Sequence, residues 1–72
     1  MIVSRTTVKG LKSDLTRIIP FLIESNTTFL YNPDNVELIV ECGGILIQAI
    51  SERICADITM SHEYKNKSLK DI

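Results

Sequence analysis

The most strongly patterned stretch of the chain is residues 36–50, where two apolar, β-prone runs are joined by a glycine pair. Gly43 and Gly44 predict a two-residue hairpin turn, because such turns require positive φ angles that glycine accepts. In this register the side chains alternate between two faces of the hairpin. One face is wholly apolar and is expected to form the core; it contains Val36, Leu38, Val40, Cys42, Ile45, Ile47 and Ala49.

A second β-prone run, residues 27–31, is followed by the tetrapeptide Asn-Pro-Asp-Asn at residues 32–35. Proline at the second position fixes its φ for a type I turn, and Asn35 tolerates the left-handed conformation that closes a bulged hairpin. The tetrapeptide therefore predicts that residues 27–31 pair with residues 36–42 as antiparallel strands.

The register of this pairing decides which face each side chain occupies. We place Asn32 opposite Val36. Leu30 then points toward the core, whereas Phe29 and Tyr31 point toward the second face of the sheet. A shift of one residue would exchange the two faces.

The N-terminal part of the chain contains a strand pattern followed by a helix pattern. Residues 2–8 are rich in β-branched side chains and predict a strand, which Gly10 ends. Residues 13–25 predict an amphipathic helix with Ser13 as its N-cap. Pro20 inside it predicts either a kink near residues 16–20 or a helix that is tight before Pro20 and regular after it. The apolar stripe of this helix is expected to cover the core face of the sheet through Leu15, Ile18, Ile19 and Leu22.

The C-terminal part has a less decisive pattern. Residues 51–60 fit a helix capped by Ser51, which we favour, but their alternating apolar residues also fit a fourth antiparallel strand. Residues 61–72 are polar and rich in lysine, and they predict a tail or a loosely docked helix. The folded domain is therefore placed at residues 1–60.

Together these elements predict a small α+β domain. Its sheet is a single-layer antiparallel meander with one helix packed on it, in the order β-α-β-β-β plus a short C-terminal helix or strand. A chain of 72 residues buries only about 60% of its unfolded surface, so a partner subunit is a common source of further stability. We therefore expect a homodimer.

The second face of the predicted sheet mixes aromatic and aliphatic side chains. Either the C-terminal segment covers this face, or the face forms a contact with a partner, most simply a second copy of the chain. The residues of this candidate protein interface are Phe29, Tyr31, Ile39, Leu46 and Ile50.

The formal charge of −1 is unevenly distributed along the chain. Residues 1–20 carry four basic residues against one acid, residues 21–60 carry six acids against one base, and residues 61–72 carry three bases against two acids. Basic residues near the chain ends favour an acidic partner such as nucleic acid. The candidate phosphate-contacting residues in this alternative are Arg5, Lys9, Lys12 and Arg17.

The sequence predicts no catalytic residue, no metal site and no cofactor. Cys42, Cys55 and His62 lack the paired spacing of a zinc site, and buried or surface roles are far commoner for them. The glycine pair lacks the motif of a phosphate-binding loop. The two nearby acids Glu37 and Glu41 are most simply solvated side chains on a sheet.

The sequence shows neither a signal peptide nor an apolar run of about 20 residues that could span a membrane, so we expect a cytoplasmic protein with reduced thiols. The expected function is that of a non-enzymatic protein-interaction module, homodimeric, acting as a small accessory or inhibitor protein. The alternative is a nucleic-acid-binding or regulatory module that uses the basic ends of the chain, and an enzyme ranks third.

Overall fold

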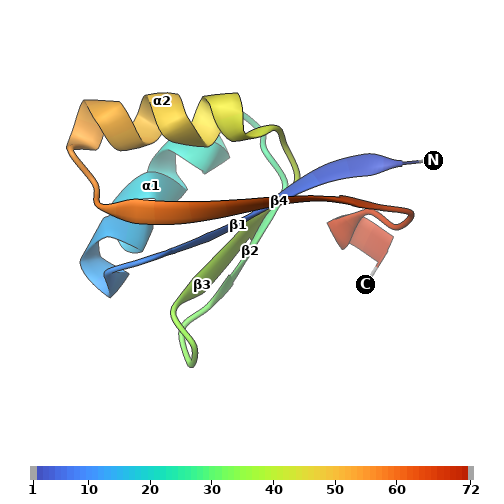
Figure 1. Ribbon diagram of the computed structural model, residues 1–72, viewed down its shortest axis with the longest axis horizontal. Coiled ribbons are helices and arrows are strands. Elements are labelled where there is room, and N and C mark those ends of the chain that lie inside the picture. Colours follow the sequence, from blue (N-terminus) through green and yellow to red (C-terminus); the bar gives the residue numbers. More distant parts are fainter. Residues whose placement is uncertain (1, 72) are drawn as a thin grey trace.

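The computed structural model describes residues 2–71, which form four strands, two α-helices and a short C-terminal 3-10 helix (Figure 1). In chain order the elements are β1 (Val3–Gly10), α1 (Lys12–Glu24), β2 (Phe29–Asn32), β3 (Glu37–Val40), α2 (Gly44–Ile54), β4 (Ile58–Lys65) and η1 (Leu69–Asp71). The strands form one sheet in the order β2-β3-β1-β4, and all neighbours are antiparallel. The predicted α+β class is confirmed, and the β-α-β-β-α-β connectivity is that of ferredoxin-like folds.

Both helices lie on one face of the sheet, and the core lies between the helices and the strands (Figure 1). The buried apolar side chains of this core are Val8, Leu38, Val40, Leu15, Ile18, Leu22, Ile47 and Ile50. Ile19 packs against the core from its margin. The apolar stripe predicted for the first helix is therefore confirmed, because the 3.6-residue period directs these positions to one side.

The start of α1 differs from the prediction by one residue. The helix begins at Lys12, and its N-cap is Leu11, which has an extended backbone and no capping side chain. The N–H of Asp14 donates to the Leu11 carbonyl at 3.0 Å, so the first turn closes before Ser13 can act as the cap. Ser13 is therefore not the N-cap, and the helix continues through Pro20.

The predicted hairpin at the glycine pair is wrong. Gly43 is the N-cap of α2 with φ −70° and ψ 159°, and neither glycine of the pair has a positive φ. The apolar run after it forms a helix, with Ile47 and Ile50 in the core and Ile45 largely exposed. A short apolar run does not by itself distinguish a strand from a buried helix, and here packing over the sheet decides the outcome.

The glycine at position 44 is explained by a close approach. A Cβ atom at Gly44 would overlap the imidazole of His62, which lies on β4 across from the start of α2. The ring is held in place because its Nδ1 lies 3.0 Å from the Thr6 hydroxyl. A larger residue at position 44 would therefore displace His62.

The hairpin between β2 and β3 is confirmed, but its register differs by one residue. Tyr31 lies opposite Leu38 and Leu30 lies opposite Ile39. The left-handed residue of the turn is Val36, with φ 50°, rather than the predicted asparagine. The turn is thus one residue longer than expected.

This shift exchanges the two faces of β2, as a one-residue change must. Phe29 and Tyr31 lie on the helix side and pack against the core. Leu30, predicted to be buried, is 51% exposed on the opposite face.

Residues 51–60, whose sequence fits both a helix and a strand, contain the end of a helix and the start of a strand. Residues 51–54 end α2, Cys55 follows in a left-handed conformation, and Ile58 begins β4. β4 pairs with β1 over eight residues and reaches Lys65, so residues 61–65 are a strand rather than the predicted tail or docked helix, whereas residues 69–71 form the short 3-10 helix η1. The sequence did not predict that the strand extends to Lys65, because its side chains there are polar. A strand at the sheet edge is held by backbone pairing more than by apolar burial.

Candidate functional site

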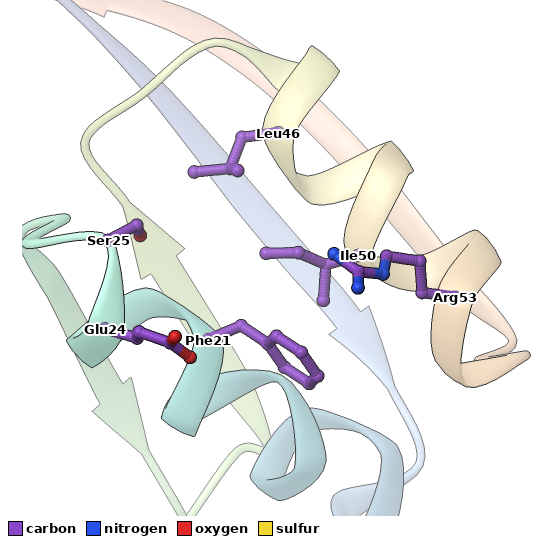
Figure 2. Close-up of a pocket in the computed structure, with 6 residues that line it drawn as sticks. All are labelled: Phe21, Glu24, Ser25, Leu46, Ile50 and Arg53. Atoms are coloured by element: carbon purple, nitrogen blue, oxygen red, sulfur yellow. The ribbon is translucent and has the colours of Figure 1, made fainter.

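A groove runs between the end of α1 and the side of α2 that faces it, with a volume of about 330 Å³ (Figure 2). Its lining residues are Phe21, Glu24 and Ser25 from the end of α1, and Leu46, Ile50 and Arg53 from α2. Ile50 is nearly buried, and both Phe21 and Leu46 are half-buried against the core. The groove therefore has an apolar floor that remains open to solvent.

Two opposite charges flank this floor. Figure 2 shows Glu24 and Arg53 on opposite sides of the groove, one from each helix. Both residues are exposed, and neither is among the ion pairs found within residues 2–71. This arrangement suits a ligand that has an apolar face between a basic and an acidic group.

The five residues of the predicted interface do not share one surface. Leu46 and Ile50 line the groove. Phe29 and Tyr31 lie at the sheet's edge strand on the helix side, and Ile39 lies on the opposite face. Phe21 and Arg53 were missed, because the groove becomes visible only when residues 44–54 are recognised as a helix.

The face of the sheet opposite the helices is mixed in character. Its apolar residues include the cross-strand pair of Leu30 and Ile39, and Val3 at the start of β1. Around this pair, hydroxyl and charged side chains predominate, and Lys9 pairs with Glu37 at 3.8 Å. Within the described strands, the aromatic residues all have the alternation of the helix side, so this face has no platform for stacking bases.

The four basic residues proposed for nucleic acid are divided between two sides of the molecule. Arg5 and Lys9 belong to the open face of β1, whereas Lys12 and Arg17 belong to α1 on the other side. Arg17 is also engaged within the fold: it lies 3.7 Å from Asp14 and donates to the Ile54 carbonyl at 2.8 Å. These residues do not form one phosphate-binding surface.

Residues 67–71, which include η1, form a C-terminal turn. This turn docks near the end of β3 on the open face, the face of the sheet opposite the helices (Figure 1). The Glu41 carboxylate accepts hydrogen bonds from the Ser68 hydroxyl at 2.8 Å and from the Leu69 N–H at 2.9 Å. The Arg5 guanidinium donates to the Lys67 carbonyl at 2.7 Å. The bonds from Ser68 and Leu69, followed by the charge of Arg5, lower the pKa of Glu41 below its ordinary value.

The two cysteines are free thiols in different surroundings. Cys55 is exposed, whereas Cys42 is half-buried and burial raises the pKa of its thiol. The Cys42 carbonyl accepts a hydrogen bond from the Thr6 hydroxyl, which also lies beside His62. In the part of the chain that the structure describes, no three histidine, cysteine or acidic side chains gather to hold a metal ion.

Comparisons with known protein families, with characterised proteins and with solved structures find no match for this chain. Neither helix within residues 2–71 is long and apolar enough to cross a membrane. A fold of this kind does not by itself define a function, so the geometry of the groove between α1 and α2 carries the functional argument.

Proposed function

We propose that this chain is a non-enzymatic, homodimeric protein-interaction module that acts in the cytoplasm as a small accessory or inhibitor protein. The observation that carries the proposal is the groove between α1 and α2. Phe21 and Leu46 are only half-buried there, and together with the buried Ile50 they form an apolar floor.

The occupant we propose for this groove is a helical segment of a partner protein. Two neighbouring helices leave a furrow into which the apolar stripe of a third helix packs, with anchors at i, i+3 or i+4, and i+7. Removing the floor from water would stabilise the complex by about 25 cal/mol for each Å² of apolar surface buried.

The charges beside the groove define the orientation of this partner helix. A basic residue of the partner would lie near Glu24 and an acidic residue near Arg53. Such charges at an interface rim contribute more to specificity and to the association rate than to affinity. An inhibitor or accessory protein that works by occupying a surface requires this kind of selective contact.

The test is a comparison of two charge reversals on the helix layer. Arg53→Glu changes the groove, whereas Lys12→Glu makes the same change of charge on exposed α1 outside it. A partner captured by the wild type should be retained by Lys12→Glu and reduced with Arg53→Glu. Titration of the purified partner should then show several-fold weaker binding to Arg53→Glu alone.

The control of fold integrity is urea denaturation of both variants, because each change is at an exposed site. Equal affinity of the purified partner for Arg53→Glu and the wild type would show that the groove is not the binding site. A purified partner that binds both reversals equally weakly would show that net charge, rather than the groove, governs association.

A further inference from the structure

The outer edge of β4 is the longest unpaired strand edge of this sheet. One side of β4 pairs with β1 over eight residues, and its other side is the end of the sheet. The opposite edge strand, β2, has only four residues. From Ser61 to Lys65 every residue of β4 is exposed, so the edge is accessible.

Such an edge presents a row of backbone N–H and C=O groups that can pair with another strand. We infer that β4 pairs antiparallel with β4 of a second copy, which extends the sheet to eight strands. This inference rests on the proposed homodimer and identifies the surface that forms it.

The symmetry of the dimer restricts the register to a few choices. An antiparallel pair of identical strands is related by a twofold axis normal to the sheet, and residues directly opposite each other point to the same face. One residue of β4 therefore lies opposite its own copy. The central candidates are Ser61, His62 and Glu63.

Charge selects the register centred on Ser61. In that register Lys65, the last residue of β4, lies opposite Asp57, the residue just before β4 in the second copy. Lys65 also pairs with Glu63 of its own chain at 3.0 Å, and Asp57 adds a second carboxylate beside it at both ends of the interface. Centring on Glu63 would place that carboxylate opposite its own copy, which is unfavourable. Centring on His62 would place the two imidazoles opposite each other and would leave Lys65 opposite a threonine.

The same register provides a partner for an exposed aromatic ring. Tyr64 is 77% exposed in the single chain. Centring on Ser61 places it opposite Ile58 of the second copy, on the helix side of the sheet, where an aromatic and a β-branched side chain form a favourable cross-strand pair. Tyr64 is thus covered without any change in the fold.

The dimer has a consequence for the proposed groove. Because the axis is normal to the sheet, the helices of both copies lie on the same face of the eight-stranded sheet. The two grooves then open on one side of the assembly. A partner with two suitable helices would bind both grooves and gain from the second, intramolecular contact.

The experiment is a cysteine scan across the twofold axis. In a Cys55→Ser background, Ser61→Cys should form a disulfide-linked dimer under mild oxidation, because opposite residues of an antiparallel pair have Cα atoms about 4.5–5.5 Å apart, within reach of a disulfide. His62→Cys and Glu63→Cys are the matched controls on the same strand. The parent Cys55→Ser shows whether Cys42 contributes to crosslinking.

Light scattering across a concentration series completes this test. Preferential crosslinking of Ser61→Cys supports the inference, whereas preferential crosslinking at either control position overturns the register. A dimer in solution that none of the three variants crosslinks overturns the β4 interface and leaves the homodimer of the proposed function intact. A chain that stays monomeric at high concentration overturns both.

Charge exchange tests the register without introducing a thiol. Lys65→Glu should weaken the dimer about three- to tenfold, because it reverses two symmetric contacts at an exposed interface. Combining it with Asp57→Lys should restore the wild-type dissociation constant. Lys67→Glu, which makes the same charge change beyond β4, should have no such effect. An unchanged dissociation constant in Lys65→Glu would overturn the Ser61 register.

Discussion

The Glu41 carboxylate accepts a hydrogen bond from the Ser68 hydroxyl at 2.8 Å, although the two residues are 27 positions apart in the chain. Ser68 is only 7% exposed, so this bond holds a nearly buried hydroxyl beside the end of β3. The Leu69 N–H adds a second bond to the same carboxylate oxygen. Glu41 thus holds the C-terminal turn on the sheet at two points, beside the bond that Arg5 donates to the Lys67 carbonyl.

This relationship predicts that the turn detaches in acid. The pKa of Glu41 is lowered in the folded chain by the bonds from Ser68 and Leu69, so the ionised carboxylate stabilises the docked state. The stabilisation is complete above the ordinary carboxyl pKa of 4.5 and is lost as the pH falls through the lower folded value. Amide exchange at Leu69, followed from pH 6 downward, should accelerate relative to the core amides below about pH 4.5.

The control for this titration is Glu41→Gln, which keeps the shape of the side chain and removes its charge. Its Leu69 amide should exchange faster at neutral pH and should lack the acid transition. Glu24→Gln, on an exposed part of α1, should behave like the wild type. An acid transition that persists in Glu41→Gln would assign the effect to another carboxylate.

The second prediction separates the two glycines of the pair. Gly44→Ala should lower the free energy of unfolding by on the order of 1 kcal/mol, because its Cβ displaces His62 and breaks the contact with Thr6. Gly43→Ala has open space around the new Cβ. It should stay within about 0.5 kcal/mol of the wild type, since a poorer N-cap and a less flexible unfolded chain have opposite effects.

Urea denaturation of the two variants gives this comparison directly. Equal losses of stability would contradict the role assigned to His62. Adding His62→Ala to Gly44→Ala should remove most of the extra cost, because the obstructing ring is then absent.

The third prediction concerns the end of α2. Cys55 has φ 53° and ψ 44°, a left-handed conformation that glycine adopts without a steric cost. Because the Cys55 side chain is exposed, Cys55→Gly loses little packing and should raise the free energy of unfolding by about 0.5–1 kcal/mol. Cys55→Ala keeps a Cβ and should therefore not raise the free energy of unfolding. A shift of the urea midpoint in the same direction for both would point to the thiol rather than the backbone.

The fourth prediction concerns nucleic acid. Since Lys9 and Lys12 lie on different sides of the fold, we expect weak or absent binding to generic DNA or RNA near physiological salt. Gel shifts at several salt concentrations measure this. A tight, salt-sensitive complex that Lys9→Glu with Lys12→Glu abolishes, and that Lys65→Glu with Lys67→Glu retains, would establish the alternative function.

The elements that the sequence predicted correctly are those in which the spacing of the apolar residues determines which side chains are buried. Leu15, Ile18 and Leu22 repeat at helical spacing, and no strand could bury all three on one side. The strand at the N-terminus is similarly clear from its β-branched residues. Both elements have a local pattern that agrees with their tertiary environment.

The parts that sequence did not predict depend on information outside the local pattern. A turn one residue longer, closed by Val36 in a left-handed conformation, reverses the faces of β2. The helix after Gly43 follows from its packing over the sheet, and the apolar run at its start is equally compatible with a strand. The groove was missed for the same reason, since Leu46 and Ile50 meet Phe21 only across two helices.

The pairing of the first strand with the last determines how the chain must fold. Val3 lies opposite Lys65, so the central strand acquires its second neighbour only after nearly the whole chain has been brought together. The helices and the β2-β3 hairpin can form from nearby residues, whereas this final closure requires contacts between distant residues. Such contacts raise the contact order and slow the folding rate. Until β4 pairs with it, β1 is itself an open edge of the sheet. The chain is most vulnerable to aggregation before this pairing forms.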